Sequence, residues 1–330
     1  MKRKLMAIGL TMVMILCSLV ACKKDNGLTK VNLNEVAHSI FYAPMYVAIE
    51  KGYFAEEGLD VDLVNGLGAD KTMTAVLSGD ADIGFMGSEA SIYVYNQGKE
   101  DYIVNFAQLT QRAGNFLVGR EKQEKFDWNQ LKGKTIIGGR EGGMPQMVLE
   151  YILKEKGIDP DKDVTIIQNI DFGLTGEAFA SGTGDYTVEF EPAAYKLEKE
   201  GKGYVVASLG VESGMVPYTA YSAKKSYIKK HPEIIQSFTN AIQKGLEYVG
   251  SHDSADIAKV IKPQFKETDM EALISIVERY RSQNTWKGDT VFKQESFDLL
   301  QSILDKAGQL DKKADYSLLV TTEYSKKAVK

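Results

Sequence analysis

The chain has 330 residues, of which 44% are hydrophobic and 26% charged, and its formal net charge is −5. This ordinary globular composition excludes a disordered chain, and the acidic balance argues against a nucleic-acid binder, which would need a basic face. The length is too great for one small hydrophobic core and suits two lobes of ordinary domain size.

The two cysteines, Cys17 and Cys22, both lie near the N-terminus, so we expect the body of the protein to contain neither a disulfide nor a thiolate metal site. The three histidines, His38, His231 and His252, are far apart in the sequence, which argues against a histidine-rich metal site. We therefore expect neither a metal nor a cofactor.

The N-terminus has the order of segments that is typical of a bacterial lipoprotein signal. A basic start at residues 1–4 precedes an uncharged stretch at 5–21, and a small residue, Ala21, stands directly before Cys22. This pattern predicts a signal peptide over 1–21, a lipidated Cys22 and a polar tether over 22–30. The alternative is an uncleaved membrane anchor, for which the 17-residue apolar stretch is at the lower limit of length.

The first third of the body alternates between strand-like and helix-like segments, which predicts α/β layers with largely parallel sheets. The expected strands cover 31–36, 59–64 and 82–86, and the expected helices cover 43–54, 69–77 and 88–96. Ser88 is the expected N-cap of the third helix.

The middle third repeats this alternation, and the last third is mostly helical. Expected strands cover 134–138, 164–168, 186–190 and 204–207, and expected helices cover 144–156, 173–180 and 192–200. After Pro217 we expect helices over 232–249, 254–261, 269–283 and 293–307. Residues 77–90 and 179–194 both run from a helix end through Ser-Gly and Asp into a strand, and then to an acidic residue at the next helix. This echo favours two similarly built lobes.

Ligands of open parallel sheets bind beyond the carboxyl ends of the strands, and four segments fall there. They cover 38–46, 65–70, 86–89 and 138–145. Glycines in these turns let the backbone approach a ligand, and the N-termini of the following helices favour an acceptor or an anion. Each segment also has a purely structural interpretation: the aromatic side chains fit a core, and the glycines fit tight turns. Gly66 and Gly68 form neither a dinucleotide-binding fingerprint nor a P-loop.

The acidic pair Glu189 and Glu191 stands at a predicted strand end, with both carboxylates expected on one side. Two carboxylates could act in acid–base catalysis, but no nucleophile or metal set accompanies them, and helix capping is the alternative role. We therefore assign no catalytic residue and expect a protein that is not an enzyme.

Several segments resemble one known superfamily. They are Phe-Tyr-Ala-Pro-Met-Tyr-Val-Ala at 41–48, Lys-Gly-Tyr-Phe-Ala-Glu-Glu-Gly-Leu-Asp-Val at 51–61, Ser-Gly-Asp-Ala-Asp-Ile-Gly at 78–84, Leu-Lys-Gly-Lys-Thr-Ile at 131–136 and Glu-Pro at 191–192. The superfamily comprises the solute-binding proteins of ABC importers for sulfonates, taurine, nitrate and thiamine pyrimidine precursors, together with the related thiamine-pyrimidine synthases. The synthases carry a cysteine-rich motif that this chain lacks.

The resemblance implies a type II periplasmic-binding-protein fold, with two lobes and a hinge made of two chain crossings. It places the first lobe at 31–112 and 219–330, the second at 113–218, and the crossings near 111–115 and 215–221. The ligand-binding residues it implies are Ser39, Phe41, Tyr42, Gly66, Gly68, Gly87, Ser88, Glu89, Gly142, Gly143, Met144, Glu189, Glu191 and Tyr218.

The resemblance also implies the partners: a small-molecule ligand, the permease subunits of an ABC importer, and the membrane through lipid on Cys22. We expect a monomer, held by that lipid on the extracytoplasmic face of the cell membrane, and no nucleic acid. Aromatic walls with carboxylate acceptors suit a flat, amine-bearing heterocycle, so an aminopyrimidine thiamine precursor is our first expectation for the ligand. A sulfonate, taurine or nitrate ligand is the alternative, and a thiamine-pyrimidine synthase is the enzyme alternative.

Overall fold

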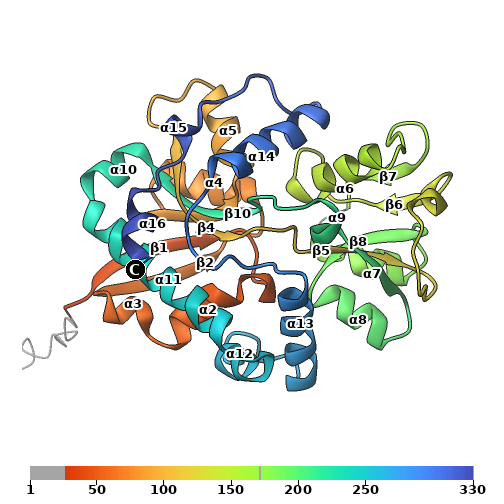
Figure 1. The fold of residues 1–330 in the computed structure, drawn as a ribbon, viewed down its shortest axis with the longest axis horizontal. Coiled ribbons are helices and arrows are strands. Elements are labelled where there is room, and N and C mark those ends of the chain that lie inside the picture. The colour runs from red at the N-terminus through yellow and green to blue at the C-terminus, as the bar shows by residue number, and fades with distance from the viewer. Residues whose placement is uncertain (1–26, 171, 330) are drawn as a thin grey trace, which may run out of the picture.

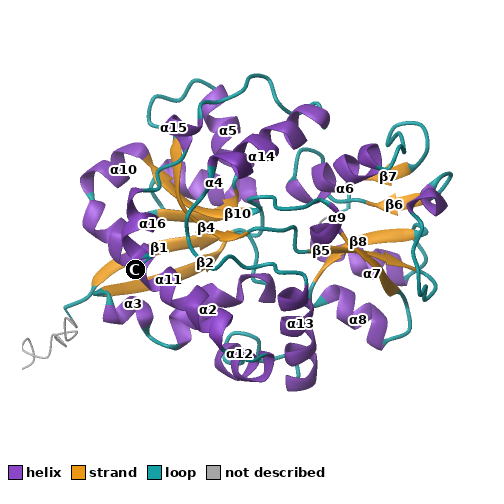
Figure 2. Ribbon diagram, in the orientation of Figure 1, coloured by secondary structure: helices purple, strands orange, loops and turns teal. Residues whose placement is uncertain are grey.

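The computed structural model describes residues 27–170 and 172–329. The expected signal peptide and Cys22 lie outside these residues. The described chain forms two α/β lobes, each built around one five-stranded sheet (Figure 1). The two groups of strands are well separated, and loops connect them (Figure 2).

The first sheet has the strand order β2-β1-β3-β10-β4. Its strands are β1 (Thr29–Glu35), β2 (Leu59–Asn65), β3 (Ile83–Gly87), β4 (Ile103–Thr110) and β10 (Thr219–Lys224). Strands β1, β2 and β3 are parallel, and β10 runs antiparallel between β3 and β4. The helices between these strands are α2 (Ala43–Glu50), α3 (Tyr53–Glu56), α4 (Ala69–Ser78) and α5 (Glu89–Asn96), and the 3-10 turn η2 (Ile40–Tyr42) precedes α2.

The second sheet has the order β7-β6-β8-β5-β9. Its strands are β5 (Asn115–Gly119), β6 (Thr135–Ile137), β7 (Thr165–Ile167), β8 (Tyr186–Phe190) and β9 (Tyr204–Ser208). Its helices are α6 (Met144–Glu155), α7 (Thr175–Ala180), α8 (Ala193–Lys199) and α9 (Leu209–Glu212), with short 3-10 turns η3 (Trp128–Leu131) and η4 (Phe172–Leu174). Here β5 is the antiparallel strand, between β8 and β9.

Each sheet therefore has four strands in one direction and one strand against them, so the sheets are mixed but largely parallel, as expected, apart from β5 and β10. The antiparallel strands β5 and β10, together with β4, are the strands that the sequence pattern missed. Every residue of β4 and β5 is buried, so neither strand shows the polar alternation of a half-exposed strand. Strand β10 lies between two other strands and is just as buried except at its last residue.

The chain passes from the first sheet to the second through residues 111–114 and returns through 213–218. The remaining helices are α10 (Lys225–Lys230), α11 (Pro232–Ser251), α12 (Ser254–Ile261), α13 (Met270–Ser282), α14 (Gln294–Lys306), α15 (Tyr316–Leu319) and α16 (Glu323–Ala328). Helix α11 packs against α2, α3 and β4 of the first lobe, whereas α14 reaches α6 of the second. Helix α13 lies between the two lobes at the lower edge of Figure 1.

Two local expectations are corrected. The helix expected over 43–54 is divided into α2 and α3, because Gly52 adopts the left-handed conformation (φ 74°) between them. Ser88 does not cap α5: its backbone is already helical, and its hydroxyl donates a hydrogen bond to the carbonyl of Pro217.

Candidate functional site

The loop after β1 carries the first group of predicted site residues and contacts the second lobe directly. The Ser39 hydroxyl caps η2 by accepting a hydrogen bond from the Phe41 N–H (3.3 Å), and it donates one to the carbonyl of Glu191 (3.1 Å). Beneath the loop, the Tyr46 hydroxyl donates to the buried Glu35 carboxylate (2.6 Å), which also holds His38 (2.8 Å). This ion pair raises the pKa of His38. The Ser39 hydrogen bond thus joins the loop to the second lobe, and the contacts of Glu35 hold it within the first.

An aromatic cluster fills the junction of the lobes and the crossings. The ring of Phe41 lies 5.1–5.7 Å from those of Tyr42, Phe190, Tyr218 and Tyr280. Phe41 belongs to the first lobe, Phe190 ends β8 of the second, and Tyr218 lies on the return crossing. Phe41, Tyr42 and Tyr218 are almost fully buried, so they act at least as core residues, and their contact with a ligand stays a prediction.

Glu89 is a buried carboxylate at the start of α5. One of its oxygens is held by its own backbone N–H, and the other, Oε2, has no hydrogen-bond partner among the described residues. Burial raises its pKa from 4.5 to about 7. A Cβ on Gly87 would lie 2.2 Å from Glu89 Oε2, so glycine at position 87 makes room for this carboxylate.

Glu189 is buried within the second lobe. Its carboxylate accepts hydrogen bonds from the hydroxyls of Thr187 (2.6 Å) and Thr175 (3.1 Å). Burial raises its pKa to about 7. These partners belong to β8 and α7, so the contacts seen for Glu189 lie within the second lobe.

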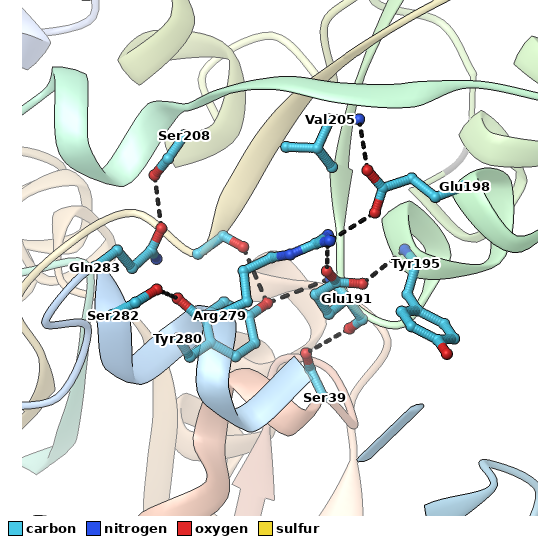
Figure 3. A network of polar contacts seen from close by, with 11 residues as sticks. Ser39, Glu191, Tyr195, Glu198, Val205, Ser208, Arg279, Tyr280, Ser282 and Gln283 are labelled. Carbon is cyan, nitrogen blue, oxygen red and sulfur yellow. Dashed lines mark hydrogen bonds and ion pairs between the residues drawn. The ribbon is translucent and has the colours of Figure 1, made fainter. Parts of the chain in front are cut away.

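Glu191 occupies a different environment. Its carboxylate forms an ion pair with Arg279 of α13 (2.5 Å) and accepts a hydrogen bond from the Tyr195 N–H (2.8 Å), as Figure 3 shows. The second Arg279 nitrogen binds Glu198 (2.5 Å). The two acidic residues therefore have separate partners. By accepting the hydrogen bond from the Tyr195 N–H, Glu191 also caps the start of α8. Helix capping was the alternative to a catalytic role in the sequence analysis.

The glycine-rich turn of the second lobe contacts the first lobe at two points. Arg140 approaches Asp70 (4.0 Å), and the Tyr93 hydroxyl donates to the carbonyl of Gly142 (3.2 Å). The N–H groups of Gly66 and Gly68 donate to first-lobe carbonyls (2.7 and 2.9 Å), so these two groups are engaged within the protein. Gly143 is the N-cap of α6, and Met144 at its first position is buried.

Three residues near the cleft were missed by the sequence analysis: Asn115, Phe190 and Arg279. Asn115 is fully buried, and neither atom of its amide has a hydrogen-bond partner within the described part of the chain. Arg279 lies 88 positions after Glu191, and no local pattern links the two. Phe190 was visible in the sequence only as a residue between two acidic ones.

Other features of the described residues do not compete with this site. Two surface hollows, of about 290 and 330 Å³, lie on the first lobe, beside α4 and between α10 and the C-terminal segment. Across 27–170 and 172–329, no cluster of His, Cys, Asp and Glu could hold a metal ion. Within the same ranges, no helix has both the length and the apolar character needed to cross a membrane.

The protein has two lobes that meet over buried carboxylates and aromatic rings and are joined by two chain crossings. This is the architecture of the two-lobe class of solute-binding proteins. Residues 40–255 match the family model described as "NMT1/THI5 like", and the chain belongs to this family. A Bacillus subtilis (strain 168) protein named "Putative binding protein YtlA" is 51% identical over 96% of this chain and 94% of its own length.

Two further similarities span most of the chain. The formylaminopyrimidine-binding protein of Halalkalibacterium halodurans is 24% identical over 73% of this chain and 74% of its own. The periplasmic nitrate-binding protein NrtA of Synechocystis PCC 6803 superposes with a TM-score of 0.73, at 16% identity, over 91% of this chain and 88% of its own. This likeness confirms the predicted two-lobe, type II periplasmic-binding-protein fold.

Proposed function

We propose that this protein is an extracytoplasmic solute-binding lipoprotein that delivers a small heterocycle, an aminopyrimidine related to thiamine precursors, to an ABC importer. The fold and the family support the binding-protein class, and the 24% identical formylaminopyrimidine-binding protein supports the ligand. The proposed lobe boundaries are 31–112 with 219–330 and 113–218. The proposed ligand-binding site consists of the residues that the resemblance implies in the sequence analysis.

The observation that carries the ligand proposal is the buried carboxylate of Glu89. A buried carboxyl group with an unpaired oxygen is costly unless a partner donates to it. An amino group on a flat ring supplies that donor, and the neighbouring aromatic side chains supply the stacking surfaces. A sulfonate or nitrate presents only acceptors, so it could pair with Glu89 only where that carboxyl group is protonated.

We further propose that the protein binds without turnover. The cleft residues described above include no nucleophile–base–orienter set, and the named relative of 51% identity is a binding protein by its name. The rival is a thiamine-pyrimidine synthase. Incubating the purified protein with pyridoxal phosphate and iron tests this directly, because formation of a pyrimidine product would overturn the proposal.

The ligand is tested in two steps. Mass spectrometry of small molecules released from natively purified, then denatured protein should identify an amine-bearing heterocycle. Calorimetry should then show binding of 4-amino-5-hydroxymethyl-2-methylpyrimidine and no binding of taurine or nitrate. The opposite selectivity would establish the sulfonate or nitrate alternative instead.

Glu89→Gln tests the residue itself. Replacing one carboxyl oxygen by an amide N–H donor should weaken binding of the aminopyrimidine by about 1–3 kcal/mol, which is roughly five- to 150-fold. Glu150→Gln on α6 is the matched control, because Glu150 also has a burial-raised pKa but lies outside the proposed site. Unchanged affinity in Glu89→Gln would remove the main argument for an amine-bearing ligand.

A further inference from the structure

Asn115 is a buried amide that the described residues leave without hydrogen bonds. It is fully buried, and within the described chain its side-chain nitrogen and oxygen both lack hydrogen-bond partners. The buried amide of Gln283 provides the comparison: it donates to the Ala113 carbonyl (3.2 Å) and to Thr285 (2.8 Å), and accepts from Ser208 (2.6 Å). Burying an amide without hydrogen bonds costs free energy, so Asn115 requires an explanation that Gln283 does not.

The position of Asn115 indicates where its amide lies. It is the first residue of β5, directly after the outward crossing, and it stands opposite Phe190 in the antiparallel pair of β5 and β8. Residues directly opposite in such a pair have their side chains on the same face of the sheet. The ring of Phe190 lies 5.7 Å from that of Phe41 and 6.1 Å from that of Tyr218. Asn115 therefore lies on the face of the second sheet that meets the first lobe.

Two other buried polar groups of this junction are also unpaired. The Tyr218 hydroxyl and Glu89 Oε2 have no hydrogen-bond partner in the part of the chain that the structure describes. The charge of Glu89 contributes to raising the pKa of Tyr218, after burial and Tyr42, which places the two groups near each other. Unpaired groups from the second sheet, the return crossing and the first lobe thus gather around the same aromatic rings.

We propose that Asn115 sets the specificity of the site by reading a donor–acceptor edge of the ligand. A carboxamide presents one N–H donor and one C=O acceptor side by side in one plane. Its complement is a ring nitrogen next to an exocyclic amino group, which is the edge that asparagine and glutamine recognise on adenine. An aminopyrimidine has this edge, whereas a ligand with acceptors alone leaves the Asn115 oxygen unpaired. This inference rests on the proposed function and deepens it.

The test uses calorimetry with two probes: 4-amino-5-hydroxymethyl-2-methylpyrimidine and the same ring with the amino group replaced by hydrogen. Asn115→Leu removes both hydrogen-bonding atoms and keeps the branching of the side chain. Tyr221→Phe is the matched control, since the Tyr221 hydroxyl is likewise buried without a described partner, but its ring is stacked on Phe85 within the first lobe (4.3 Å).

We expect wild type to prefer the amino probe at least tenfold, and Asn115→Leu to weaken its binding at least tenfold while reducing that preference. Tyr221→Phe should bind like wild type. Thermal unfolding without ligand separates recognition from a structural role: Asn115→Leu should melt at or above the wild-type temperature, because an unsatisfied amide is removed.

The outcomes separate the two proposals. If wild type binds neither probe, the aminopyrimidine proposal fails and this inference fails with it. If wild type binds the amino probe and Asn115→Leu binds it equally well, only the role of Asn115 is overturned. A lowered melting temperature for unliganded Asn115→Leu, with the probe preference unchanged, would assign Asn115 a structural role instead.

Discussion

Replacing Arg279 by leucine tests whether α13 holds the second lobe through its ion pairs. Arg279 binds Glu191, whose side chain is fully buried, and Glu198, which is partly exposed (Figure 3). Removing one partner of a buried pair leaves an uncompensated charge and costs about 3–5 kcal/mol, whereas a partly exposed pair adds about 0–1 kcal/mol. Arg279 itself is only partly buried, so we expect the lower end, about 3 kcal/mol.

The assay is urea unfolding at pH 7, supported by thermal unfolding. If the described chain of about 300 residues unfolds as one unit, its unfolding entropy is about 0.6 kcal/mol per kelvin, so 3 kcal/mol corresponds to a fall of about 5 °C in Tm. Arg281→Leu is the control, since Arg281 lies on the same helix and donates to Ser254 of α12 (3.2 Å). It should cost less than about 1 kcal/mol.

The double variant Arg279→Leu with Glu191→Gln identifies the cause. If the stability loss in Arg279→Leu arises from the unpaired buried charge of Glu191, neutralising that carboxyl group should recover about half of the lost free energy of unfolding. Strictly additive losses, or a loss below about 0.5 kcal/mol for Arg279→Leu alone, would refute the reasoning. In that case the connection between α13 and the second lobe would rest on packing.

Two further predictions follow from the pH response and the N-terminus. The pKa values of Glu89 and Glu189 are raised by burial from 4.5 to about 7, so the native state binds more protons than the unfolded state between these values. Unliganded protein should therefore be more stable at pH 5 than at pH 8 in urea unfolding, by up to about 3 kcal/mol per group. Glu189→Gln should make the free energy of unfolding less dependent on pH. A rise in stability toward pH 8 would contradict the assignment. Cys22→Ser should abolish incorporation of labelled fatty acid in a bacterial host, and label retained in that variant would exclude the proposed anchor.

The sequence predicted the elements that carry their own local signal. Helix α4 of the first lobe has an apolar face, and strand β2 alternates between more and less exposed positions, so both periods are visible. Strand β5 shows no such period because all of its residues are buried. The sequence analysis therefore missed both this strand and Asn115, its first residue. Glu89 was found because it follows a strand end, but its unpaired oxygen depends on the packing of residues distant in sequence. The ion pair of Glu191 with Arg279 is formed only by the three-dimensional fold.

The contact between α13 and the second lobe has a consequence for the order in which the protein is completed. Ribosomes make Glu191 88 residues before Arg279, so a nascent chain that already contains every strand of the second sheet still lacks the cation for that carboxylate. The same holds for Tyr280, whose hydroxyl donates to the Gly114 carbonyl (3.0 Å). Although its sheet is contiguous in sequence, the second lobe receives these contacts from a later segment, so a fragment covering 113–218 alone should be less stable than the same residues in the whole chain.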